Sequence, residues 1–131
     1  MPEIRVKARV VYPGRVEGEA LVSREPIGFL GGVDPDSGLI IEAGHPLEGQ
    51  SLVGRILVFP TGKGSTVGSY TLYRLARNGL APTAIVNAEA DPVVAVGAVI
   101  AEIPMVDRVD LSQIHTGDWV EIRDGELLIC H

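Results

Sequence analysis

The sequence predicts an α/β fold with a parallel sheet, helices on one face and an antiparallel second layer. The first observation is that strand and helix patterns alternate as β–α–β–α–β over residues 55–106. Two right-handed crossovers of this kind place their strands parallel in one sheet. The second is that strand patterns also open and close the chain, and these are expected to form the antiparallel layer. A length of 131 residues predicts one domain, residues 1–131.

The first third of the chain contains two strand patterns and a long loop. Residues 4–12 begin with an apolar side chain at every second position, which is typical of a half-buried strand. Pro13 and Gly14 end this pattern, and a second strand is expected over 16–23. Residues 26–38 are rich in Gly, Pro and Asp and therefore predict a loop.

The remaining elements follow from apolar runs and from helical periodicity. Strands are expected at 56–59, 84–86 and 103–106, and helices at 65–78 and 92–100. Gly79 stands where a residue in the left-handed region ends a helix. Asp91 before Pro92 predicts an N-cap followed by the first helical residue. Asp124 and Gly125 predict a tight turn between two final strands.

Charge and hydropathy exclude several classes of function. The formal net charge of −6 weighs against a nucleic-acid partner, because phosphate backbones require a basic surface. The Lys and Arg residues are scattered, and no apolar run approaches the ~20 residues that span a bilayer. The first ten residues lack the apolar core of a signal peptide. A soluble, cytoplasmic protein without a membrane partner is therefore expected.

The cysteine and histidine residues predict no metal site within this chain. Cys130 is the only cysteine, so neither an internal disulfide nor a cysteine-ligated metal site is expected. His45, His115 and His131 lie far apart in the sequence without the spacing of metal ligands. They are interpreted as surface or loop residues.

The segment Pro60-Thr61-Gly62-Lys63-Gly64-Ser65-Thr66 carries the strongest functional signal, because it lies between a predicted strand and a predicted helix. Its glycines allow close approach of a ligand to the backbone, and a helix start offers free N–H groups to an anion. Ser65, Thr66 and Ser69 add hydroxyl groups, and Lys63 adds a positive charge. The spacing differs from that of a Walker A loop, a Rossmann fingerprint and a hydrolase nucleophile elbow.

Two interpretations of this segment remain open on the residues alone. Ser65 or Thr66 is either an N-cap or part of a functional site. Three glycines packed around one hydroxyl are more than a cap requires, which favours a site.

Three longer segments, GGVDPDSG (31–38), GHPLEGQSLVGRILVFPTGKGST (44–66) and IVNAEADPVVAVGAVIAEIPMVD (85–107), resemble the small subunits, or swivel domains, of the aconitase X family. The likeness extends over roughly residues 4 to 130. The Gly-Lys-Gly-Ser and Ala-Asp-Pro blocks together make it specific. Within the family, the chain is most similar to the small subunits of archaeal phosphomevalonate dehydratases.

This resemblance implies a swivelling β/β/α domain and a hydro-lyase that is active only with a large subunit. The large subunit would hold a [4Fe–4S] cluster, and Ser65 would be the proton acceptor. The reaction would convert (R)-5-phosphomevalonate to trans-anhydromevalonate 5-phosphate in an archaeal mevalonate pathway of isoprenoid biosynthesis. The alternatives are a related dehydratase of the cis-3-hydroxyproline type and a non-catalytic, anion-binding swivel module.

The substrate-binding residues expected beside Ser65 are Gly62, Lys63, Gly64, Thr66, Ser69 and Asp34. Asp34, in Gly-Gly-Val-Asp-Pro, is by type a turn residue, and its match to a family block makes it a candidate at the rim of the site. His45 is expected to be a loop residue, and Arg55 and Arg74 are expected to be solvated. A phosphohistidine-carrying swivel module is disfavoured, because no histidine lies in a Gly- and Thr-rich loop before a helix.

Overall fold

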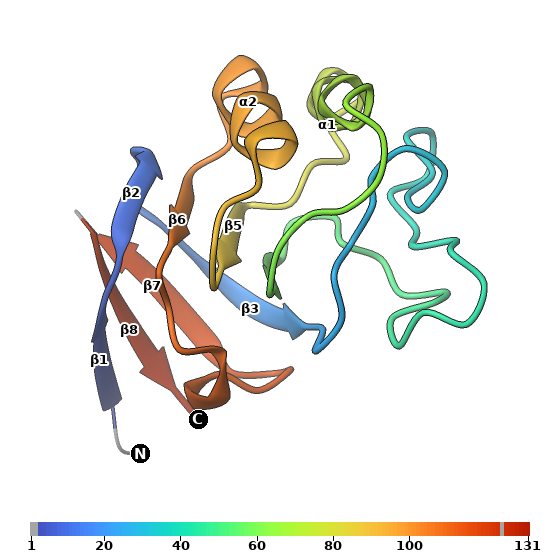
Figure 1. The fold of residues 1–131 in the computed structure, drawn as a ribbon. Helices are drawn as coiled ribbons and strands as arrows, with labels where there is room; N and C mark the ends of the chain where they lie inside the picture. Colours follow the sequence, from blue (N-terminus) through green and yellow to red (C-terminus); the bar gives the residue numbers. More distant parts are fainter. Residues whose placement is uncertain (1–2, 124) are drawn as a thin grey trace.

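The computed structural model describes residues 3–123 and 125–131 (Figure 1). In this part of the chain the helices are α1 (Gly68–Arg77), α2 (Pro92–Ala101) and the short 3₁₀ helix η1 (Leu111–Gln113). The strands are β1 (Glu3–Lys7), β2 (Arg9–Tyr12), β3 (Val16–Val22), β4 (Ile56–Phe59), β5 (Ala84–Asn87), β6 (Met105–Asp107), β7 (Trp119–Arg123) and β8 (Glu126–Cys130).

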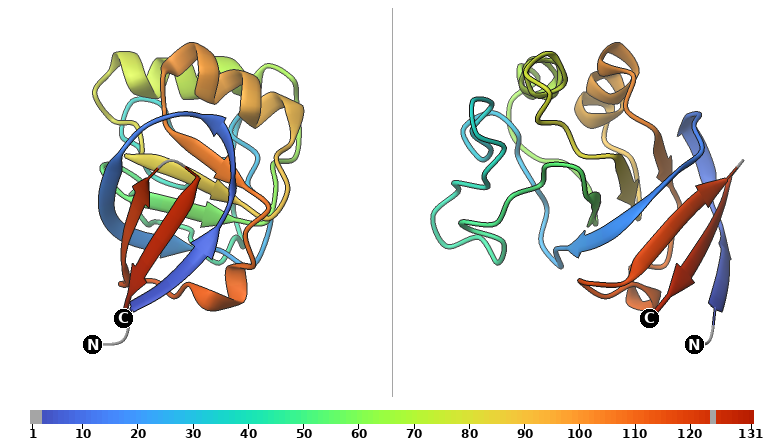
Figure 2. Two further views of the ribbon diagram at one scale, coloured as in Figure 1. Left: turned by 90° about the vertical axis from the view of Figure 1, so that its left-hand side faces the viewer. Right: turned by 180° about the vertical axis from the view of Figure 1, so that it is seen from behind.

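The strands form one sheet in the order β1-β8-β7-β3-β4-β5-β6-β2. Strands β3 to β6 are parallel neighbours, whereas β1, β8, β7 and β3 pair antiparallel. The predicted antiparallel layer is therefore not a separate sheet, because β3 pairs with β4 on one side and with β7 on the other. The sheet folds over on itself. Both helices cover the outer face of its parallel half, which is the face turned away from the antiparallel half (Figures 1 and 2).

Two apolar cores result from this arrangement, and β4 contributes to both. Leu57 and Phe59 pack beneath the helices, whereas Ile56 and Val58 pack between the two halves of the sheet. Successive side chains of a strand point to opposite faces, so a strand covered on both faces is apolar at every position. The prediction of a buried strand at 56–59 is confirmed.

Several predicted boundaries are confirmed and two are wrong. Asp91 caps α2, since one carboxylate oxygen accepts the Val93 and Val94 amides at 2.7 and 3.2 Å, and Gly79 has a φ of 71°. The single strand expected over 4–12 is broken at Ala8, because β1 pairs with β8 whereas β2 pairs with β6. The other error, the start of the first helix, concerns the site described below.

The closing hairpin of β7 and β8 is confirmed by their antiparallel pairing. Gly125 has a φ of 80°, and Asp124 lies outside the described residues. Within the described ranges, neither α1 nor α2 nor any other helix has the length and apolar character that a membrane span requires.

Candidate active site

Ser65 lies in a turn between β4 and α1 and is not the N-cap of the helix. The helix begins at Gly68 rather than at Ser65, and the residue at its N-cap position is Val67. The Val67 amide donates to Ser65 Oγ at 3.2 Å, and the Gly68 amide donates to the Ser65 carbonyl at 3.0 Å. These bonds close a turn one residue ahead of the helix. The N-cap interpretation of Ser65 or Thr66 is therefore wrong.

The Ser65 turn is exposed and offers polar backbone groups to solvent. Residues 63–67 are all exposed. Within residues 3–123 and 125–131, the amides of Gly64, Ser65 and Thr66 donate to no protein atom. Gly64 has a φ of 89°, a conformation that strains any residue with a Cβ atom. The exposed Ser65 hydroxyl, which accepts the Val67 amide, and the free N–H groups of residues 64–66 are thus presented together, as an anionic ligand requires.

The glycines of the turn allow neighbouring segments to pack closely around it. Residues 27 and 62 form a parallel bridge, in which the Lys63 amide donates to the Ile27 carbonyl at 3.2 Å. A Cβ atom on Gly62 would lie 2.5 Å from Cγ2 of Val94 on α2. A Cβ atom on Gly28 would lie 3.0 Å from the Lys63 carbonyl oxygen. Gly62 and the neighbouring Gly28 are thus needed for packing, whereas Gly64 is needed for its backbone conformation.

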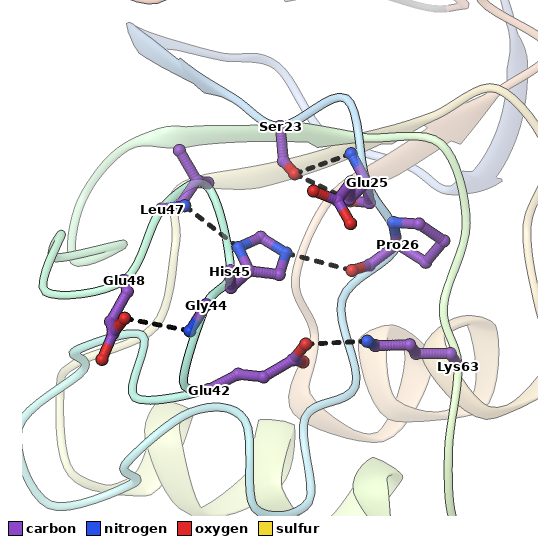
Figure 3. Close-up of polar contacts among 9 residues, drawn as sticks. All are labelled: Ser23, Glu25, Pro26, Glu42, Gly44, His45, Leu47, Glu48 and Lys63. Carbon is purple, nitrogen blue, oxygen red and sulfur yellow. Dashed lines mark hydrogen bonds and ion pairs between the residues drawn. The ribbon is translucent and has the colours of Figure 1, made fainter.

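Lys63 is directed toward Glu42 (Figure 3). Its Nζ atom lies 2.8 Å from Glu42 Oε2, and the two side chains are 47% and 32% exposed. The charge expected to act beside Ser65 is therefore shared with a carboxylate. Glu42 was not identified from the sequence, because an acidic residue in a loop of this composition carries no distinguishing pattern.

Two shallow hollows adjoin the Ser65 turn. One is lined by Gly28, Leu30, Gly31, Gly32, Glu42, Lys63 and Gly64. The other is lined by Thr66, Ser69, Pro92, Val93 and Val96. The first is polar at Lys63 and Glu42 and is otherwise walled largely by glycine backbone, whereas the second is mainly apolar.

His45 is buried, with only 6% of its surface exposed, although it lies in a loop as expected. Its Nε2 atom is 3.0 Å from the Pro26 carbonyl oxygen, and the Leu47 amide donates to its Nδ1 atom at 3.0 Å (Figure 3). The second contact requires Nδ1 to be an acceptor, so Nε2 carries the proton and donates to Pro26. His45 thereby connects its own loop to the segment that pairs with residues 61–63.

The structure does not bring Asp34 to the Ser65 turn. Its carboxylate accepts the Ser37 hydroxyl at 2.7 Å and the Asp36 amide at 3.0 Å, and these bonds, the Ser37 bond foremost, lower its pKa. The same loop contacts the last turns of α1, where Asn78 donates to the Pro35 carbonyl at 2.8 Å. Ser65 precedes the opposite end of that helix. Asp34 thus organises a turn, and its substrate contact remains a prediction.

The remaining candidate side chains are engaged within the fold. Ser69 is buried and donates to the Thr66 carbonyl at 3.1 Å. Arg55 lies 3.4 Å from Glu19, and Arg74 lies 3.4 Å from Asp36. Ser69 also lines the apolar hollow beside the turn, and its substrate contact remains a prediction.

Cys130 ends β8, and two histidines lie close together near the same end of that strand. Cys130 is half-buried, and its Sγ atom lies 4.0 Å from Glu3 Oε2. Two of the histidines that lie far apart in the sequence are close together in the structure. His115 and His131 meet at Asp118, with their ring centroids 5.7 Å apart.

Comparison with known proteins shows the same family over nearly the whole chain. The model of the aconitase X swivel domain matches residues 5–129. The phosphomevalonate dehydratase small subunit of Methanosarcina acetivorans is 51% identical over 129 residues, which cover 96% of this chain and 90% of that protein. The small subunit of the same name from Thermococcus sibiricus is 54% identical over 119 residues, covering 91% and 92%.

Solved structures agree with these sequence matches. The crystal structure of Thermococcus kodakaraensis aconitase X in its holo-form has a TM-score of 0.96 and 50% identity, covering 98% of this chain and 99% of that chain. The solution structure of a UPF0107 protein has a TM-score of 0.88 and 45% identity, covering 98% and 100%.

Proposed function

Because the chain belongs to the aconitase X swivel-domain family, we propose that it is the small subunit of a dehydratase with a separate large subunit. Its relatives at about 50% identity are named phosphomevalonate dehydratase small subunits. The substrate is (R)-5-phosphomevalonate, and the product is trans-anhydromevalonate 5-phosphate. The reaction belongs to a cytoplasmic, archaeal mevalonate pathway.

Ser65 is the proton acceptor in this proposal, and its exposed hydroxyl in the glycine turn is the observation that carries the assignment. The carbon next to the substrate carboxylate loses a proton to Ser65 Oγ. The electrons of that C–H bond form the double bond, and the C–O bond on the adjacent carbon breaks, so that hydroxide leaves with the electrons of that bond. A serine needs its alkoxide stabilised to act as a base, and preorganised N–H groups provide such stabilisation.

Lys63 and the free amides of the turn bind an anionic group of the substrate in this proposal. The ion pair of Lys63 with Glu42 is exposed, and exposed pairs contribute only about 0.2–1 kcal/mol. A carboxylate or phosphate can therefore compete with Glu42 for the ammonium group. Gly62, Gly64 and Thr66 place the backbone at this position, and Ser69 supports the Thr66 carbonyl.

The residues of this chain do not fit an iron–sulfur cluster. Such clusters are held by several cysteine thiolates, and Cys130 is the only cysteine in the sequence. We assign the [4Fe–4S] cluster to the large subunit, together with the group that accepts the departing hydroxide. No step assigned to Ser65 depends on the cluster.

The test is Ser65→Ala in the complex with the large subunit. Turnover of (R)-5-phosphomevalonate is expected to fall by ~10²–10⁴-fold, the usual effect of losing a positioned base. Complex formation, measured by gel filtration, is expected to persist, because the exposed Ser65 side chain bonds only within its own turn. Ser112→Ala, at an exposed serine within η1, is the matched control and should retain full activity.

Two further measurements complete the test. The small chain by itself is expected to be inactive, and measurable turnover without a large subunit would contradict a shared site. The complex is also assayed with cis-3-hydroxyproline, and preference for that compound would replace the proposed substrate. Near-normal kcat in the Ser65→Ala complex would remove Ser65 from the reaction.

A further inference from the structure

The end of β8 and the loop before β7 bring three metal-binding side chains together. His115, Asp118 and His131 each offer one ligand atom, and these atoms lie within 4.8 Å of one another. His131 Nδ1 is 2.9 Å from Asp118 Oδ2, and His115 Nδ1 is 3.8 Å from the same oxygen. The cluster lies near the C-terminus, on the side of the molecule away from α1 and α2 (Figures 1 and 2).

The fold itself accounts for this convergence. Trp119 pairs with Cys130 in the antiparallel register of β7 and β8, so the residues just beyond them, Asp118 and His131, are neighbours. His115 joins them through a tight turn, in which the Asp118 amide donates to the His115 carbonyl at 3.0 Å. The hairpin therefore places side by side residues that are distant in the sequence.

The carboxylate at the centre of the cluster is held in place before any ion binds. Asp118 is 7% exposed, and its Oδ2 atom accepts the His115 amide at 2.8 Å. Hydrogen bonds of this kind orient the ligands of metal sites. The His115 side chain, by contrast, is 64% exposed, so solvent and ions can reach its ring.

We propose that His115, Asp118 and His131 form a site for a divalent transition-metal ion of the Zn²⁺ class. Two imidazoles and one carboxylate are a ligand set that Zn²⁺ accepts, with a solvent molecule completing the tetrahedron. Bonds of about 2.0–2.1 Å in a tetrahedron separate ligand atoms by about 3.3 Å. The observed 2.9 and 3.8 Å lie on either side of this value, so small movements of both imidazole rings would bring the ligand atoms to tetrahedral spacing.

The test is a titration of the full chain with Zn²⁺, followed by isothermal calorimetry and by two-dimensional NMR of the imidazole nitrogens. One Zn²⁺ per chain is expected, released by EDTA, with shifts at the rings of His115 and His131. The His45 ring should not shift, because both of its nitrogens are already engaged. His115→Ala and His131→Ala are each expected to weaken binding by at least ~10-fold, the lower limit seen when a metal site loses even a supporting contact.

Cys130→Ser is the matched control, because Cys130 neighbours His131 in sequence but its thiol is directed at Glu3. Its Zn²⁺ affinity should equal that of the unmodified chain. The proposal is overturned if the unmodified chain shows no saturable binding, if both histidine variants bind normally, or if only Cys130→Ser abolishes binding. Circular dichroism of each variant establishes that it is folded before it is titrated.

Discussion

The ion pair of Asp107 with Arg9 makes the stability of the fold sensitive to a single carboxylate. Asp107 lies at the end of β6 with no exposed surface, and Arg9 on β2 donates to its two oxygens at 2.8 and 2.7 Å. The Ala90 amide adds a third bond at 2.8 Å. We predict that Asp107→Asn destabilises the chain. The asparagine amide has a single acceptor oxygen for the three N–H donors, so its NH₂ group faces at least one donor and leaves that donor without an acceptor.

The expected loss of stability depends on how deeply Asp107 and Arg9 are each buried. Removing one partner of a buried pair typically costs about 3–5 kcal/mol. Because the Arg9 side chain is 49% exposed and remains solvated in the variant, we expect about 3 kcal/mol at pH 7. For a domain of this size, that corresponds to a decrease in Tm of about 10 °C.

The pH dependence of stability provides a second, independent test of this ion pair. The hydrogen bonds from Arg9, followed by the Ala90 amide, lower the pKa of Asp107 below its ordinary value, although burial opposes them. A lowered folded-state pKa means that the ion pair contributes fully above the unfolded pKa of about 4. This contribution is lost as the pH falls through the folded pKa. The difference between the unmodified chain and Asp107→Asn should therefore shrink on acidification.

The assay is thermal unfolding followed by circular dichroism at pH 7 and at pH 3. Asp110→Asn is the control, since Asp110 also has a lowered pKa, mainly through its bond with Ser112, but lies exposed beside η1. A smaller loss than that of Asp107→Asn is expected for this control. Equal Tm values for the unmodified chain and Asp107→Asn at pH 7 would refute the argument, as would a difference that does not shrink at pH 3.

Two further pairs of substitutions separate packing from chemistry at the site. Gly62→Ala places a Cβ atom 2.5 Å from Val94 and should cost ~1–3 kcal/mol of stability. Gly64→Ala meets no steric obstacle, but its φ of 89° is strained for alanine and should cost ~1–2 kcal/mol. Urea unfolding measures both losses. Lys63→Met should raise KM by roughly 10-fold with little change in kcat, as loss of uniform binding does. Glu42→Gln, which frees Lys63, should leave KM no higher, and steady-state kinetics of the complex with the large subunit tests both.

Strands and helices from residue 56 onward were predictable because local patterns coincide with the tertiary environment. The apolar run at 56–59 is covered on both faces, and Asp91 has the N-cap role that its position before Pro92 predicts. The break at Ala8 was not predictable in this way, because alternation continues through it. What changes there is the pairing partner, from β8 to β6, and that depends on the whole sheet.

The candidate site was predictable only as far as its backbone. Glycine spacing located the turn at 62–65, but Glu42, the partner of Lys63, and the buried His45 both come from the loop of residues 42–48, which lacks periodicity. The metal-binding cluster was missed for a related reason. A histidine and an acid three residues apart are common, and only the register of β7 and β8 adds His131 to them.

The geometry around Ser65 favours an active site that another chain completes. A base that works as an alkoxide needs positive charge nearby, and the ammonium group of Lys63, close by in the sequence, is paired with Glu42. The turn contributes the hydroxyl and the free amides of residues 64–66 on an exposed surface. Exclusion of water from such a surface requires a covering partner, since electrostatic stabilisation of an oxyanion is strongest in a dry site. A large subunit seated over the turn would exclude water and would add the groups that bind the departing hydroxide, which is why we propose that Ser65 lies at a subunit interface.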